Sequence, residues 1–120
     1  MAKILIVDDD SLICDVYGLY LSNAGHNAIS CVDGAEAIRS ILAERPDLVL
    51  LDLYMPHING FELLRAIKGD PISRSVPVIV LSSRCDRKRV EHAAMLGAAD
   101  FLCKPIRGKP LVDAVIRALG

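Results

Sequence analysis

The stretch that determines the fold is ILIVDDD at residues 4–10, an aliphatic run that ends in three consecutive aspartates. Residues 48–52, LVLLD, show the same pattern of an apolar run that ends in an aspartate. Similar apolar runs cover 28–31, 78–81 and, more weakly, 100–103. None of these runs alternates with polar residues, which is typical of strands buried on both faces of a parallel sheet. The sequence therefore predicts five buried strands.

Apolar residues recur with a helical period between these strands. In chain order, the positions that share one helix face are Leu12, Val16, Leu19 and Tyr20; Ala35, Ile38, Ile41 and Leu42; Phe61, Leu64 and Ile67; Val90, Ala93, Ala94 and Met95; and Leu111, Val112, Val115, Ile116 and Leu119. A strand followed by a helix, five times over, predicts a parallel sheet with helices on both faces, because the crossovers are right-handed. We predict one doubly wound α/β domain, (βα)5, over residues 1–120.

Composition limits the class of protein. The chain has 120 residues, with 14 basic and 15 acidic side chains, so the net charge is −1. This balance gives no reason to expect direct binding to nucleic acid or to a membrane surface. No apolar stretch reaches membrane-spanning length, and four apolar residues near the N-terminus are too few for a signal peptide.

The four cysteines are Cys14, Cys31, Cys85 and Cys103, and no two of them form a C-x-x-C pair. Their wide spacing argues against a metal site or a disulfide framework. We expect small buried thiols in a reducing compartment, and hence a cytoplasmic protein.

Acidic residues follow two of the predicted strands. Ligands of open α/β sheets bind beyond the carboxyl ends of the strands, where the strand order reverses. If the first and third strands are neighbours there, Asp8 and Asp9 meet Asp52. Carboxylates this close repel one another unless a cation lies between them, and Mg²⁺ suits a site with few carboxylates and a phosphate oxygen. Asp10 or Ser11 has an alternative role as the N-cap of the first helix.

The other strand ends add a hydroxyl and a cation. The fourth strand leads into Ser82 and Ser83, and the fifth into Lys104 followed by Pro105. A serine hydroxyl can donate to a phosphoryl oxygen, and a lysine can pair with a carboxylate or a phosphate. An ordinary loop serine and a surface lysine are the alternatives for each residue alone. The Lys104-Pro105 step in a tight connection also favours a cis peptide.

Taken together, these segments resemble the receiver domain of two-component response regulators, a family that includes a single-domain chemotaxis regulator. The markers, in order, are Ile4 to Asp10, Leu51 to Pro56 with Gly60, Leu81 to Ser83, Gly97-Ala98 and Lys104-Pro105. The resemblance covers essentially the whole chain. It implies a flavodoxin-like sheet in the order 2-1-3-4-5.

The resemblance also assigns roles to residues. It implies that Asp52 is the phosphoacceptor and that Mg²⁺ or Mn²⁺ is held by Asp9, by Asp8 through water, by Asp52 and by the Tyr54 backbone carbonyl. Ser82, where threonine is more frequent, matches the switch hydroxyl, and Lys104 matches the phosphate-contacting lysine. Phe101 matches the switch aromatic, often tyrosine, and lacks the hydroxyl that makes one contact of the active state.

A signalling role follows from these assignments. The implied donor is a phosphohistidine of a sensor histidine kinase or a histidine phosphotransfer protein, and the domain is not an enzyme beyond its own phosphotransfer and hydrolysis. Tyr54 and Arg84 match positions beside the phosphoryl group, and their bulk predicts slow self-dephosphorylation. The readout face is expected on the fourth helix, fifth strand and fifth helix. The basic residues Arg84, Arg87, Lys88 and Arg89 suggest a solvated face or, as the minority interpretation, a partner or homodimer surface.

Three alternatives compete with this interpretation. A phosphatase with an aspartyl nucleophile typically carries a second aspartate two residues later, and Tyr54 stands there. A flavodoxin-like cofactor binder would need a phosphate loop after the first strand, where the aspartates would repel phosphate. A degenerate receiver that only docks partners would not need the complete set of acidic, hydroxyl and lysine side chains.

Overall fold

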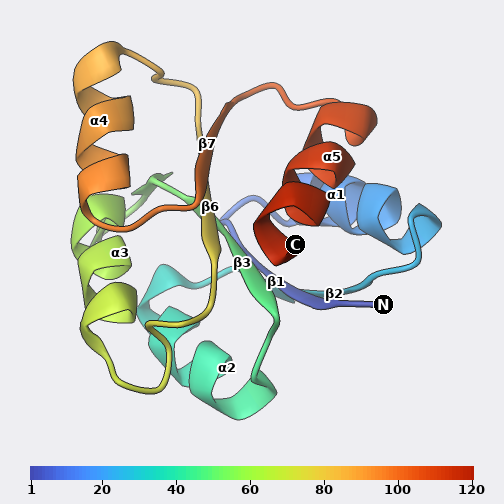
Figure 1. Ribbon diagram of the computed structural model, residues 1–120, viewed down its shortest axis with the longest axis horizontal. Coiled ribbons are helices and arrows are strands. Elements are labelled where there is room, and N and C mark those ends of the chain that lie inside the picture. The colour runs from blue at the N-terminus through green and yellow to red at the C-terminus, as the bar shows by residue number, and fades with distance from the viewer.

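The computed structural model describes all 120 residues, and its centre is a parallel sheet of five strands (Figure 1). The strands are β1 (Lys3–Val7), β2 (Asn27–Cys31), β3 (Leu48–Asp52), β6 (Val78–Ser82) and β7 (Asp100–Cys103). They lie in the order β2-β1-β3-β6-β7, which is 2-1-3-4-5 when these five are counted along the chain. The predicted strands and the flavodoxin-like α/β fold are confirmed.

Helices cover both faces of this sheet. They are α1 (Ser11–Asn23), α2 (Ala37–Glu44, preceded by a 3₁₀ turn at Gly34–Glu36), α3 (Gly60–Gly69), α4 (Arg87–Met95) and α5 (Gly108–Leu119). Figure 1 shows α1 and α5 on one side of the sheet, and α2, α3 and α4 on the other. None of these helices combines the length and the apolar content needed to cross a membrane.

Each central strand divides its side chains between the two helical layers. In β1, Ile4 and Ile6 pack with α1 and α5, whereas Leu5 and Val7 pack with α2 and α3. β3 and β6 alternate in the same way, and all of these residues are buried. Because successive side chains point to opposite faces and both faces are covered, no strand position inside the sheet suits a polar residue. This explains the unbroken apolar runs.

The face of α1 that packs on the sheet differs from the predicted one. Cys14, Tyr17 and Leu21 are buried, while Leu12 and Leu19 are 68% and 61% exposed. Apolar residues occupy much of the circumference of this helix, so periodicity alone does not determine which stripe faces inward. The helix turns Cys14, Tyr17 and Leu21 toward the sheet, and Leu12 and Leu19 remain on the surface.

The other helices follow their predicted faces in part. Ile41 of α2, Leu64 and Ile67 of α3, and Leu111 and Val115 of α5 are buried as expected. In α4, in contrast, only Ala93 is buried, and Met95 is 85% exposed. The α4 helix is therefore loosely packed: it buries one small residue, and the His92 ring stacks on Phe61 of α3 with ring centres 4.3 Å apart.

A short hairpin that the sequence analysis did not predict follows β3. Its strands are β4 (Tyr54–Met55) and β5 (Ile58–Asn59), which pair antiparallel. The hairpin ends in a close backbone contact, where the Gly60 N–H donates to the Leu53 carbonyl oxygen (3.1 Å). A Cβ at Gly60 would lie 2.5 Å from the Leu53 Cα, so only glycine fits. This contact fixes the hairpin above the end of β3.

Candidate functional site

The carboxyl ends of β1 and β3 place three aspartates together. Val7 of β1 pairs in register with Leu51 of β3, so the residues that follow, Asp8 and Asp52, are neighbours. One carboxylate oxygen from each of Asp8, Asp9 and Asp52 lies within 4.8 Å of the others. Asp8 and Asp52 are 1% and 5% exposed, whereas Asp9 is open to solvent. The predicted acidic cluster is therefore present, with two buried members and one at the surface.

Asp10, the third aspartate of the run, has a structural role instead. Its side chain accepts hydrogen bonds from the backbone N–H groups of Leu12 and Ile13 at the start of α1. Of the two candidates for the N-cap, Asp10 rather than Ser11 fills the position. An N-cap satisfies N–H groups that have no partner inside the helix. The Asp10 side chain therefore belongs to the cap of α1 and not to the acidic cluster.

Lys104 neutralises part of the negative charge of the cluster. Its Nζ lies 2.9 Å from Asp8 Oδ2 and 3.6 Å from Asp52 Oδ2. Burial alone would lower the pKa of this lysine, but the hydrogen bond to Asp8 and the charges of Asp52 and Asp8 outweigh it and raise the pKa. The Lys104-Pro105 peptide is cis, as predicted. Lys104 therefore remains charged and directed at the two buried carboxylates.

The carboxyl group of Asp52 is costly to ionise in the absence of a cation. Burial raises its pKa to about 6; Asp8 and Asp9 add to the increase, while Lys104 and the Tyr54 N–H oppose it. The Tyr54 N–H lies 3.3 Å from Asp52 Oδ1. A buried carboxylate that faces other carboxylates gains most from an additional positive charge. The ionised form of Asp52 would therefore be stabilised by a divalent cation placed beside it.

The donor set suits a hard divalent cation. Mg²⁺ binds oxygen ligands in a nearly octahedral arrangement and uses one or two carboxylates together with waters and phosphate oxygens. Carboxylate oxygens within 4.8 Å can converge on one such ion with small side-chain rotations. No nitrogen or sulfur ligand takes part in the cluster, which disfavours zinc. The arrangement is typical of the metal site of receiver domains.

Ser82 lies at the end of β6, in register with Cys103 of β7, and is fully buried. Its hydroxyl is engaged in the loop that leads to α4: it donates to the Arg84 carbonyl oxygen (3.1 Å) and accepts from the Arg84 N–H (3.0 Å). A turn of the Ser82 hydroxyl toward Asp52 would break both bonds. The conformation of this loop is therefore tied to the orientation of one hydroxyl group.

Two arginines pack against the ring of Tyr54, whose backbone N–H contacts Asp52, and we call these three side chains the cover. The guanidinium carbons of Arg84 and Arg89 lie 5.0 and 5.9 Å from the centre of the Tyr54 ring, within the range of cation–π contacts. Arg89 also donates from Nε to the Tyr54 hydroxyl and forms an ion pair with Asp86. Tyr54 and Arg84 were predicted to border the site, but Arg89 was counted only among surface cations. Its role depends on a contact across 35 residues that no local motif reveals.

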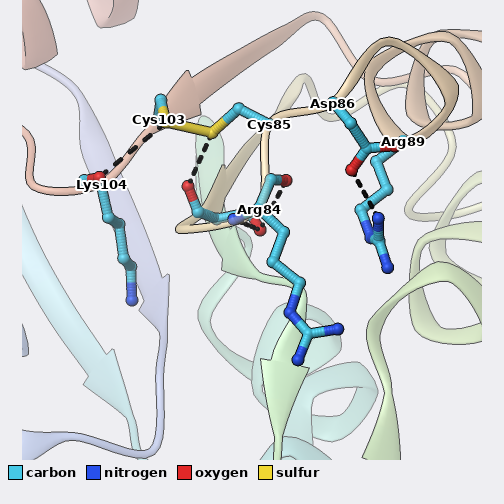
Figure 2. The surroundings of a disulfide bond; sticks show 7 residues. Arg84, Cys85, Asp86, Arg89, Cys103 and Lys104 are labelled. Atoms are coloured by element: carbon cyan, nitrogen blue, oxygen red, sulfur yellow. Dashed lines mark hydrogen bonds and ion pairs between the residues drawn. A yellow bond between two sulfur atoms is a disulfide. The ribbon is translucent and has the colours of Figure 1, made fainter.

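The prediction that the chain has no disulfide was wrong. Cys85 and Cys103 are joined by a disulfide, with Cα atoms 5.9 Å apart. Figure 2 shows the bond between the loop that follows β6 and the end of β7, beside Arg84 and Lys104. Cysteine spacing gave no signal because the two residues meet only through the pairing of β6 with β7. Cys14 and Cys31 are buried free thiols, as predicted.

Phe101 lies in the middle of β7 and is half-buried. It pairs in register with Val80 and packs against the core on the α3 and α4 side. Phe101, Val90 and Ala94 belong to the lining of a shallow pocket of about 220 Å³ between β7 and α4. The structure thus places the aromatic ring next to the loosely packed helix, away from the aspartate cluster.

Comparison with known proteins agrees with this geometry. The family model described as the response regulator receiver domain matches residues 4–116. The DNA-binding response regulator MtrA of Mycobacterium tuberculosis is 34% identical over 113 residues, which cover 94% of this chain and 48% of MtrA. The chain spans about half the length of the curated relatives it matches.

Solved structures match over nearly the full length. The chemotaxis response regulator CheY4 of Vibrio cholerae has a TM-score of 0.91 at 28% identity, with 98% of each chain covered. The receiver domain of the Francisella response regulator 1452 has a TM-score of 0.91 at 27% identity, with 99% of this chain and 97% of that chain covered.

Proposed function

Because the chain belongs to the response regulator receiver domain family, whose members work with histidine kinases, we propose that Asp52 accepts a phosphoryl group from a phosphohistidine. The observation that carries this proposal is the setting of Asp52. Its carboxylate is buried beside Asp8, a lysine Nζ lies 3.6 Å away, and the surrounding oxygens suit a divalent cation. Few roles other than phosphate chemistry would use an acidic cluster with a lysine directed into it.

The reaction is an in-line displacement at phosphorus. A carboxylate oxygen of Asp52 forms the new bond to phosphorus as the bond to the donor imidazole nitrogen breaks, and the leaving imidazole takes up a proton. Lys104 contributes positive charge at the phosphoryl oxygens, after partial release from Asp8. Asp9, Asp8, Asp52 and the Tyr54 carbonyl would hold a divalent cation, which would supply further charge neutralisation. Such transfer depends mainly on positioning and electrostatics.

Ser82 is the proposed sensor of the phosphoryl group. Its hydroxyl would leave Arg84 and donate to a phosphoryl oxygen, so the loop that begins at Ser83 would lose two hydrogen bonds and move. Phe101 would then turn inward beside α4. The resulting output surface comprises α4, β7 and α5, with either a partner protein or a second copy of the chain as its occupant.

The cover formed by Tyr54, Arg84 and Arg89 supports a long-lived phosphorylated state. Hydrolysis requires a water molecule in line with the bond between phosphorus and the Asp52 oxygen. Side chains packed over this side of the site restrict such an approach. We therefore propose slow self-dephosphorylation, with Arg89 added to the two residues identified from the sequence.

Residues 1–120 are proposed to act as one receiver module. The cytoplasmic location and the class of donor, a sensor histidine kinase or a histidine phosphotransfer protein, are predictions from the sequence. Direct nucleic-acid binding is not expected of this module, although MtrA, by its name, is a DNA-binding response regulator over its full length. The proposal of phosphorylation at Asp52 therefore does not extend to DNA binding or any other activity of the whole protein.

Intact-mass analysis after incubation with acetyl phosphate, with and without Mg²⁺, tests the proposal. We expect one phosphoryl adduct that needs Mg²⁺ and disappears in Asp52→Asn. Asp15→Asn, which changes an exposed carboxylate of α1, is the matched control and should retain the adduct. An adduct that persists in Asp52→Asn, or no adduct at all with Mg²⁺, would overturn the assignment.

A further inference from the structure

The Cys85–Cys103 disulfide joins two segments that line the candidate site. Cys85 lies three residues after Ser82, in the loop between β6 and α4. Cys103 pairs in register with Ser82 and directly precedes Lys104. The bond therefore ties the loop that holds the Ser82 hydroxyl to the strand that carries the lysine (Figure 2).

Backbone contacts continue this link. The Ser82 carbonyl oxygen accepts a hydrogen bond from the Lys104 N–H (2.8 Å), and the Cys85 Sγ lies 3.2 Å from the same oxygen. Arg84, which directly precedes Cys85, forms both hydrogen bonds of the Ser82 hydroxyl. Any movement of Arg84 away from Ser82 must therefore carry Cys85 with it or pull against the disulfide.

The position of the pair allows chemical access. Cys103 is exposed and Cys85 is half-buried, whereas Cys14 and Cys31 are buried. Cys85 lies two residues before Arg87, the first residue of α4. A helix N-terminus favours the thiolate, the form that reacts with disulfides. An exposed disulfide at such a position is suited to reversible exchange rather than to permanent cross-linking.

We propose that Cys85 and Cys103 form a reversible thiol–disulfide site, which in its oxidised state restrains the loop of residues 83–86 in the resting conformation. The consequence for signalling rests on the proposed phosphorylation of Asp52. With the disulfide closed, Ser82 cannot leave Arg84 without distorting the link to β7, so phosphorylation is opposed. With both thiols reduced, the loop moves freely and the domain responds fully.

The redox step balances by thiol–disulfide exchange with a low-molecular-weight disulfide. One cysteine thiolate attacks that disulfide, forms a mixed disulfide and releases one small thiol. The second cysteine thiolate then attacks the mixed disulfide and releases the other, so two protein thiols are oxidised and one small disulfide is reduced to two thiols. A dithiol reverses both steps.

The chemical half of the proposal is tested on the whole chain with glutathione disulfide and dithiothreitol. Oxidation should remove two hydrogen atoms from the intact mass and protect Cys85 and Cys103 from maleimide under native conditions. Reduction should make both react, while Cys14 and Cys31 stay protected. Failure to form an internal Cys85–Cys103 link under these conditions would overturn the proposal.

The coupling is tested by amide hydrogen exchange of residues 83–86 and by the initial rate of adduct formation from acetyl phosphate with Mg²⁺. Reduction should speed both, the adduct rate by about fivefold or more, the lower end of typical coupling between sites. Cys85→Ser should behave as the reduced protein with or without dithiothreitol, and Cys31→Ala should respond as the unmodified chain does.

The outcomes separate the two proposals. Equal exchange and equal adduct rates in the oxidised and reduced states would overturn the restraint. Faster exchange on reduction, together with no adduct in either state, would uphold the thiol–disulfide site and overturn phosphorylation of Asp52.

Discussion

Replacement of Asp52 by asparagine should stabilise the domain in the absence of divalent cations. Asp52 is buried beside Asp8, and its pKa of about 6 lies above the ordinary value of 3.8 because burial disfavours the charged form. Above pH 6 the folded protein therefore holds a carboxylate that the unfolded chain solvates better. Asparagine keeps the shape of the side chain and removes this charge, so the domain should become more stable while the proposed phosphoacceptor is lost.

The magnitude follows from the pKa difference. A pKa of about 6 in the folded protein, against 3.8 unfolded, corresponds to a cost of about 3 kcal/mol at neutral pH. Water at the mouth of the site screens part of this cost, so we expect Asp52→Asn to raise the free energy of unfolding by about 1–3 kcal/mol. For a domain of this size, the melting temperature should rise by about 4 °C per kcal/mol.

The sign of the pH dependence is also fixed. A carboxyl group whose pKa is raised on folding contributes stability that is complete below the unfolded pKa and is lost as the pH rises through the folded pKa. The advantage of Asp52→Asn should therefore be largest above pH 6, and at about pH 5 it should fall to about half.

Urea denaturation followed by circular dichroism, with a chelator present, measures this difference. Asp15→Asn should change stability by less than about 0.5 kcal/mol, since that carboxylate is exposed. Added Mg²⁺ should stabilise the unmodified chain more than the variant, because a ligand stabilises the state that binds it. The reasoning is refuted if Asp52→Asn is no more stable at about pH 7.5, or if its advantage is the same at about pH 5.

Three further predictions follow from named contacts. Gly60→Ala should destabilise the fold by about 1–3 kcal/mol or more in thermal unfolding, because backbone atoms of Leu53 fill the space that a Cβ would need. Gly69→Ala, where the space for a Cβ is open, should not destabilise it. Equal effects of the two variants would contradict the close contact between Gly60 and Leu53. Lys104→Met should destabilise the metal-free fold by about 3 kcal/mol, because it leaves the buried carboxylates of Asp8 and Asp52 unpaired. If added Mg²⁺ does not reduce this loss of stability, the two carboxylates do not form a cation site. Arg89→Ala should speed loss of the phosphoryl group about fivefold, as expected for a contact with Tyr54 worth about 1 kcal/mol. Arg87→Ala, on the exposed face of α4, should leave the decay rate unchanged. The same decay rate in both variants would exclude a role of Arg89 in slowing hydrolysis.

Much of the fold and the acidic cluster could be predicted because their signals are local. A strand buried on both faces needs an unbroken apolar run, and the first polar residue after it marks the rim of the sheet. Asp8 and Asp52 are such residues, and the strand order brings them together. The stripe of α1 that faces the sheet had no local signal, because apolar residues lie on several sides of that helix.

Three contacts in the structure hold one segment, the loop between β6 and α4. The Ser82 hydroxyl holds it through Arg84, the disulfide holds it to β7 at Cys85, and Arg89 at the start of α4 is held by Tyr54 across the site. The disulfide and the Arg89–Tyr54 contact join residues 18 and 35 positions apart, so no local motif predicts them. Together they would oppose the movement proposed for the switch, so a phosphoryl group at Asp52 would have to offset three restraints rather than one. In α4 only Ala93 is buried, and His92 stacks on Phe61 of α3, so we expect these restraints, together with this limited packing, to determine how readily α4 moves.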